Sequence, residues 1–111
     1  MTDKINLEGN EKITVYIDSD LEELVPGFLA SKQNDIKQFL QFLSEKNYDK
    51  IRIEGHKMKG EGRGYGFDVI SDVGSALESL AQGKNSECIR DELDKLQQYI
   101  SSLNIVYQDM D

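Results

Sequence analysis

Hydrophobic residues recur every three or four positions in four successive segments between residues 25 and 103. That spacing places them on one face of an α-helix. The last segment has the clearest period, with Ile89, Leu93, Leu96, Ile100 and Leu103. The three earlier stripes consist of Val25, Leu29, Ile36, Phe39, Leu40 and Leu43; of Tyr48, Ile51, Gly55, Met58 and Gly62; and of Phe67, Ile70, Val73, Gly74, Leu77 and Leu80. The pattern predicts an all-α fold, an up-down four-helix bundle with short connections.

The segment before these helices has a different period. Ile13, Val15 and Ile17 alternate with other residues as in a strand, but no partner strand follows. We therefore predict an extended N-terminal arm over residues 1–18, a helical domain over residues 19–104 and a C-terminal tail over residues 105–111. Ser19 and Glu22 fit a capping box, which predicts a short leading helix that ends before Pro26.

Two features interrupt the apolar stripes. Lys32 lies on the stripe of the helix that begins near Pro26, and its long side chain can carry the ammonium group to solvent. Residues 60–66 contain four glycines in seven positions, which predicts an irregular end to the next helix.

Composition excludes several classes of protein. The 111 residues hold 21 acidic and 13 basic side chains, a formal net charge of −8, which argues against binding of nucleic acid through the whole surface. The sequence shows no secretory signal and no apolar run long enough for a membrane span. The single cysteine, Cys88, cannot form an intramolecular disulfide, and we expect it to be a partly buried, inert thiol. We expect a cytoplasmic monomer that binds neither nucleic acid nor membrane.

The only histidine, His56, lies on a polar helix face that it shares with Arg52, Lys59 and Arg63. It therefore projects toward solvent, and a surface histidine without a role is the plain alternative. Gly60, one turn beyond His56, gives two further readings that the sequence leaves open. It can provide clearance for an approaching partner, or it can simply begin the glycine-rich helix end.

The charge around His56 favours a role with an anion. Residues 46–63 contain six basic and three acidic side chains in an otherwise acidic protein. A neutral imidazole is a nucleophile that can carry a phosphoryl group covalently. A basic, solvated helix face without function is the alternative reading.

The run from Gly55 to Gly62, GHKMKGEG, followed by Gly66, resembles the signature of histidine-containing phosphotransfer (HPt) domains. His56, Lys59, Gly60 and Gly66 match that pattern in identity. Met58 replaces the usual Leu or Ile, and Gly55 and Gly62 stand where slightly larger residues are common. The family's four-helix bundle with a short leading helix corresponds to residues 19–103, which is most of the chain.

The resemblance implies a phosphoryl carrier in two-component signalling. His56 would accept a phosphoryl group from the aspartyl phosphate of a response-regulator receiver domain, through its distal ring nitrogen, and pass it to a second receiver. Lys59 would neutralise the phosphoryl oxygens, and Gly60 would leave room for the receiver's loops. Arg52, Lys57 and Arg63 would supply electrostatic contacts. Ile53 would supply an apolar contact, with burial in the core as its alternative.

The resemblance also implies which groups the partner supplies. Mg²⁺ and the aspartate pocket would belong to the receiver, so the chain would hold no metal or cofactor of its own. The glycine run has no Gly-Lys-Ser/Thr after it and follows a helix rather than a strand, so it is not a nucleotide-binding loop. We therefore expect a phosphorelay intermediate rather than an autonomous kinase, with receivers and a histidine kinase as partners.

Two other functions remain open on the sequence. The chain could be a helical docking module that binds a receiver or another signalling protein without transfer, in which case His56 would be dispensable. It could also be a counterpart of the phosphoacceptor domain of chemotaxis-type kinases, in which case a kinase domain with ATP would phosphorylate His56.

Overall fold

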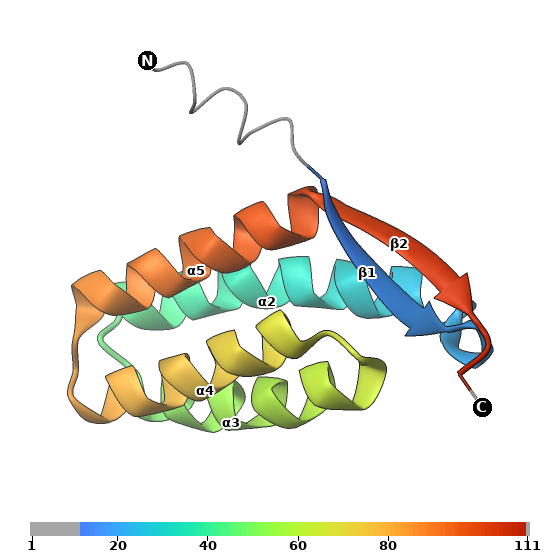
Figure 1. Ribbon diagram of the computed structural model, residues 1–111. Helices are drawn as coiled ribbons and strands as arrows, with labels where there is room; N and C mark the ends of the chain where they lie inside the picture. Colours follow the sequence, from blue (N-terminus) through green and yellow to red (C-terminus); the bar gives the residue numbers. More distant parts are fainter. Residues whose placement is uncertain (1–11, 111) are drawn as a thin grey trace, which may run out of the picture.

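The computed structural model describes residues 12–110, which form four α-helices and one pair of strands. The helices are α2 (Val25–Ser44), α3 (Tyr48–Tyr65), α4 (Asp68–Gln82) and α5 (Ser86–Ser101). Figure 1 shows them side by side, with the strands β1 (Ile13–Asp18) and β2 (Leu103–Gln108) at one end. The mostly helical architecture is confirmed, and the up-down order of the helices stays a prediction.

Local sequence signals explain where the helices begin. The Asn47 side chain accepts a hydrogen bond from the Lys50 N–H at 3.2 Å, and the Asn85 side chain accepts one from the Cys88 N–H at 3.1 Å. Each satisfies an amide that has no partner inside its helix. Pro26 lies in the first turn of α2, where its missing N–H has no cost.

One apolar core lies between the four helices. Its largest fully buried side chains come from every helix and from β1: Phe39, Phe67, Ile17, Ile51, Met58, Ile70, Leu77, Ile89, Leu93 and Leu96. Most residues assigned to the predicted stripes therefore face the interior, and Phe67 is buried as expected. Leu40 is an exception, because it is 39 % exposed and lies outside the core. Leu103 was assigned to the last helix but lies in β2, after α5 has ended at Ser101. Each fully buried aliphatic or aromatic side chain contributes about 1.5–3 kcal/mol.

The prediction that residues 13–18 have no partner strand is wrong. β1 pairs with β2 in parallel, with Ile13 opposite Leu103 and Ile17 opposite Tyr107. The residues expected to form a tail thus supply a strand, whose alternate side chains Leu103, Ile105 and Tyr107 pack against the core. The part of the predicted arm at residues 1–11 lies outside the described residues, and the domain limits at 19 and 104 stay a prediction.

The leading helix is the short 3₁₀ helix η1 (Ser19–Leu21). The proposed capping box is wrong, because Asp18 rather than Ser19 caps this turn. The Asp18 side chain accepts a hydrogen bond from the Asp20 N–H at 2.9 Å, and the Ser19 hydroxyl donates to the Asp109 carboxylate instead.

The glycine-rich segment is more regular than predicted, since α3 continues through it to Tyr65. Gly66 ends the helix at a φ of 90°, a left-handed conformation that glycine adopts without strain. Gly62 lies against the start of α4, where an added Cβ would come within 2.4 Å of the Ser71 nitrogen. The Tyr65 ring stacks on Phe28 of α2 at 4.0 Å between centroids, which fixes the last turn of α3.

The prediction that the Lys32 side chain carries its ammonium group to solvent is wrong. Lys32 is 3 % exposed, and its ammonium group forms a 2.8 Å ion pair with Asp35 and a second ion pair with Glu61 of α3. Burial would lower the pKa of Lys32, but the hydrogen bonds and charges of Asp35 and Glu61 outweigh it and raise the pKa above 10.5. A buried ammonium needs such partners, and these partners join α2 to α3.

Candidate functional site

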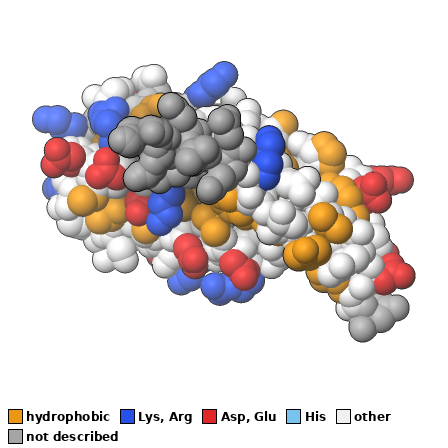
Figure 2. Space-filling model, turned by 45° about the horizontal axis from the view of Figure 1, so that its top comes forward, with side chains coloured by type: hydrophobic (Ala, Val, Ile, Leu, Met, Phe, Trp, Pro, Cys, Tyr) orange, Lys and Arg blue, Asp and Glu red, His pale blue; other side chains and the backbone are white. Residues whose placement is uncertain are grey.

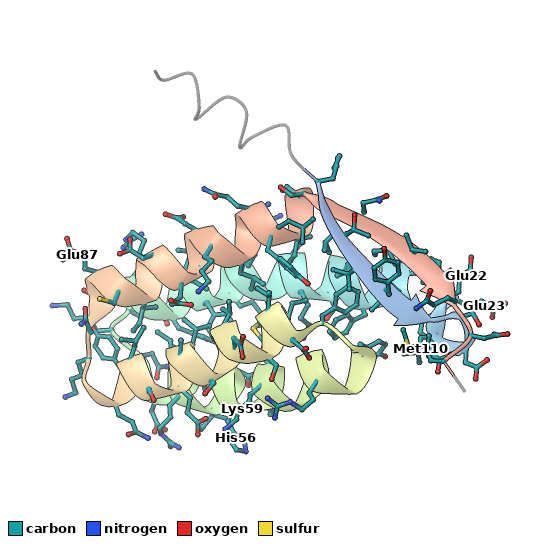
Figure 3. All side chains as sticks on the ribbon, in the orientation of Figure 1. Glu22, Glu23, His56, Lys59, Glu87 and Met110 are labelled. Carbon is teal, nitrogen blue, oxygen red and sulfur yellow. The ribbon has the colours of Figure 1, made fainter. Side chains whose placement is uncertain are left out.

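His56 lies in the middle of α3 with its ring directed away from the bundle. Its side chain is 69 % exposed, as the polar helix face predicted. Figure 3 shows His56 and Lys59 on the outer side of α3, at the edge of the molecule opposite α5. Because α3 begins at a fixed cap and ends at Gly66, the helix holds this face in one orientation.

The His56 ring contacts one residue of the neighbouring helix. Its Nδ1 atom lies 3.1 Å from Oε2 of Glu78 on α4. A carboxylate accepts only, so this hydrogen bond requires the proton to be on Nδ1. In the neutral ring the lone pair is then on Nε2, the nitrogen that faces solvent. The contact therefore orients the ring and leaves the lone pair on Nε2.

The contact between His56 and Glu78 depends on how closely α3 and α4 approach. A Cβ added to Gly74 of α4 would lie 2.7 Å from the Gly55 carbonyl oxygen, and one added to Gly55 would lie 3.0 Å from the Glu78 nitrogen. Only glycine at both positions allows this distance between the backbones. Gly55 and Gly74 lie on the predicted apolar stripes, but the sequence pattern does not connect Glu78 with His56. The small residues in both stripes were the available signal.

Lys59 lies one turn beyond His56 and is partly buried. Its carbonyl oxygen accepts a 2.7 Å hydrogen bond from the buried Ser71 hydroxyl, which ties this turn of α3 to α4. Lys59 forms no ion pair with any of residues 12–110. Its ammonium group can therefore bind an anion beside His56.

Gly60 has open space around it. A Cβ added there would meet no atom within 4 Å, so packing inside the protein does not require glycine at this position. A regular helix continues past Gly60, so the residue does not begin an irregular helix end. A glycine that costs helix stability and fills no packing role fits the interpretation that it provides clearance.

The predicted partner-binding residues lie on α3, and two of them are paired within that helix. Arg52 bonds to Asp49 at 2.8 Å, and Lys57 bonds to Glu54 at 3.3 Å. Arg63 is exposed in the last turn, and Ile53 is 39 % exposed rather than in the core. Ile53 and Arg63 thus flank His56 on the accessible side of α3.

The remaining features that bear on function are metal ligands, membrane spans and the single thiol. Within residues 12–110 no three His, Cys, Asp or Glu side chains form a cluster that could hold a metal ion, and no helix is both long and apolar enough to cross a membrane. Cys88 is exposed, so the prediction of a partly buried thiol is wrong. It precedes the buried Ile89 in the first turn of α5, where its side chain projects outward.

Comparison with known families decides what this arrangement represents. The model of the Hpt domain matches residues 23–104, well over half of the chain. The chain belongs to the Hpt domain family. No curated protein and no solved structure matched the chain. Hpt domains carry phosphoryl groups in two-component relays, interact with receiver domains and kinases, and are phosphocarriers rather than kinases.

Proposed function

We propose that the chain is a stand-alone phosphorelay intermediate that carries a phosphoryl group on Nε2 of His56. The observation that carries this proposal is the 3.1 Å contact between His56 Nδ1 and the Glu78 carboxylate on an exposed helix face. It presents a nucleophilic nitrogen to solvent without burying the ring. Membership of the Hpt family supports the same chemistry.

The proposed transfer step needs no proton acceptor. The Nε2 lone pair attacks the phosphorus of a receiver's aspartyl phosphate, the N–P bond forms, and the P–O bond to the aspartate breaks. The aspartate leaves with that electron pair as a carboxylate. The imidazole keeps its Nδ1 proton and becomes a cation, whose charge the Glu78 carboxylate offsets. Transfer to a second receiver is the reverse of this step.

The remaining site residues have proposed roles that follow from their positions. Lys59 neutralises charge on the equatorial phosphoryl oxygens, since phosphoryl transfer depends mainly on positioning and electrostatic stabilisation. Gly60 leaves room for the receiver's loops. Ile53, Arg52, Lys57 and Arg63 contact the receiver around His56. Mg²⁺ is bound by the receiver and not by this chain.

Phosphoryl transfer from a charged receiver tests the proposal. Receiver domains are phosphorylated with acetyl phosphate and Mg²⁺ and mixed with the full chain, and the intact mass of the chain is measured. We expect an acid-labile increase of one phosphoryl group that is absent from His56→Gln. Binding of a receiver without any mass increase would favour the docking-module alternative. Phosphorylation by a kinase domain with ATP, but by no receiver, would favour the kinase-linked alternative.

A further inference from the structure

Among residues 12–110 the sheet consists of β1 and β2 alone, so both of its edges lack a further strand there. The Ile13 N–H donates to the Ser102 carbonyl at 2.7 Å, on the side of β2. Successive residues of a strand direct their backbone groups to opposite edges. Thr14 and Tyr16 therefore direct their N–H and C=O groups away from β2.

A groove lies along this second edge of β1. It has a volume of about 350 Å³ and is lined on the other side by the turn after α3, the first turn of α4 and the end of α5. Its lining includes Thr14, Tyr16, Gly66, Asp68, Val69 and Tyr99. Figure 2 turns the top of the molecule forward and shows hydrophobic side chains at the surface toward the end where the strands lie in Figure 1. Ile13, Tyr16 and Val106 of the strands are exposed.

The walls of the groove indicate the shape of its occupant. Residues of α4 and α5 face the free edge of β1 across the groove. A whole β-sheet from another domain therefore has no room to pair with this edge. A single extended segment can lie between the strand and the helices and bond to Thr14 and Tyr16. Addition of a strand to an exposed edge is a common mode of peptide recognition, in which backbone hydrogen bonds supply affinity and adjacent side chains supply specificity.

The side chains around the groove indicate the chemistry of the occupant. Tyr16 is 56 % exposed, and the partly buried Val69 adds further apolar surface. Tyr99 lines the groove but is only 6 % exposed. Asp68 places a carboxylate on the opposite wall. Burial, together with the charge of Asp68, raises the pKa of Tyr99 to about 12. A basic side chain would complement the Asp68 carboxylate.

We propose that this groove binds an extended peptide segment of a partner protein, as a third strand beside β1, with a basic residue of that segment at Asp68. His56 projects from the outer side of α3, away from the strands (Figure 3). The chain can thus hold a partner at the groove while His56 stays accessible to a receiver. This proposal does not depend on phosphotransfer.

A displayed library of random heptapeptides, selected against the full chain, tests the proposal. We expect selected peptides rich in β-branched residues with one Lys or Arg. Binding should slow amide hydrogen exchange at Thr14 and Tyr16 by at least about tenfold, since each N–H gains a hydrogen bond. Protection of both amides in the free chain, selection of no peptide, or shifts confined to α3 around His56 would overturn the proposal.

Thr14→Pro removes one N–H from the free edge and leaves the backbone hydrogen bonds between β1 and β2 intact, a position that tolerates proline. It also removes the 3.4 Å hydrogen bond that the Thr14 hydroxyl accepts from the Asn104 side chain. Thr14→Val removes that bond as well, so the comparison of the two variants isolates the N–H. We expect it to weaken the Kd of a selected peptide by about tenfold. Thr14→Val keeps the N–H and should change the Kd by less than about twofold. Equal binding by both variants would contradict strand addition.

Asp68→Asn supplies a second test that does not alter the strand. It should weaken binding of the basic peptides by about threefold, as expected for a partly exposed charge pair, whereas Asp72→Asn, one turn further along α4, should not. No difference between the two variants would exclude the basic residue at Asp68. His56→Gln should bind the peptide as the unaltered chain does, so failure here is distinct from failure of phosphotransfer.

Discussion

Nδ1 of His56 and Oε2 of Glu78 are 3.1 Å apart although the two residues lie on different helices and are 22 positions apart in the sequence. The contact converts an exposed histidine into a ring with a defined tautomer and a defined outward-facing nitrogen. Glu78 is a positioning residue in this account, because it acts through the ring and not on the phosphoryl group.

Replacing Glu78 tests that relationship. Glu78→Ala should slow transfer from a charged receiver by about ten- to a hundredfold, since a hydrogen bond to a charged group contributes about 1.5–3 kcal/mol. The ¹⁵N chemical shifts of the ring should change from the Nδ1–H tautomer to a mixture of both. Glu78→Gln should retain the tautomer, because its amide oxygen still accepts, while it transfers more slowly.

Glu87→Gln is the matched control for Glu78. Glu87 is an exposed carboxylate in the first turn of α5 (Figure 3). Its replacement should leave both the transfer rate and the ¹⁵N shifts of the His56 ring unchanged. A tautomer mixture in the unaltered protein would count against the role given to Glu78.

Lys59→Ala should lower the rate of transfer by about tenfold or more while leaving affinity for the unphosphorylated receiver nearly unchanged. The reason is that the ammonium group acts on charge that the phosphoryl oxygens carry during transfer. Single-turnover kinetics with a charged receiver separate the two quantities. Lys95→Ala, which removes a basic side chain paired with Glu92 on α5, serves as the control. An equal loss of affinity and rate would instead make Lys59 a docking residue.

Two glycines of α3 should respond to alanine in opposite ways. Gly62→Ala should lower the free energy of unfolding by about 1–3 kcal/mol, because its Cβ would lie 2.4 Å from the Ser71 nitrogen. Gly60→Ala meets open space and should raise the free energy of unfolding by about 0.5–1 kcal/mol. Urea unfolding measures both.

The same Gly60→Ala variant tests clearance at His56. If Gly60 provides room for the receiver, the more stable variant should transfer more slowly. Unimpaired transfer by a stabilised Gly60→Ala protein would show that clearance is not its role.

Stability should fall as the pH rises above about 10. The folded state raises the pKa of Lys32 above 10.5 and that of Tyr99 from 10.0 to about 12. Both groups therefore lose their protons in the unfolded chain first, and the free energy of unfolding decreases with pH through this range. Well below pH 9 both are protonated in either state and add no pH dependence.

Urea unfolding between pH 9 and pH 11.5 measures this slope. Tyr99→Phe and Lys32→Met should each make the decrease shallower, because each removes one of the two groups. A slope that neither substitution alters would assign the pH dependence to other groups.

Local signals in the sequence were sufficient for the helices. Stripes such as that of Ile89 and Leu93, together with caps such as Asn85, depend only on residues within a few positions of one another. The exposure of His56 followed from the same periodicity. The pair β1–β2 could not be found this way, because opposing residues are 90 positions apart in the sequence.

The hydrophobic period also could not predict which side chains of neighbouring helices contact each other. Lys32 was expected to reach solvent, but Glu61 of α3 offers a partner that the pattern within α2 does not reveal. Glu78 reaches His56 only because Gly55 and Gly74 bring the two helices together. Such contacts depend on the rotation and spacing of two elements, which a single helix period leaves undetermined.

The most direct test of the account is the position of the phosphoryl group on the ring. The full chain, labelled with ¹⁵N in histidine, is phosphorylated by a charged receiver and examined by ³¹P and ¹⁵N NMR. The account predicts a phosphorus–nitrogen coupling to Nε2 of His56, with the proton retained on Nδ1. A phosphoryl group on Nδ1, or on any residue other than His56, would contradict it.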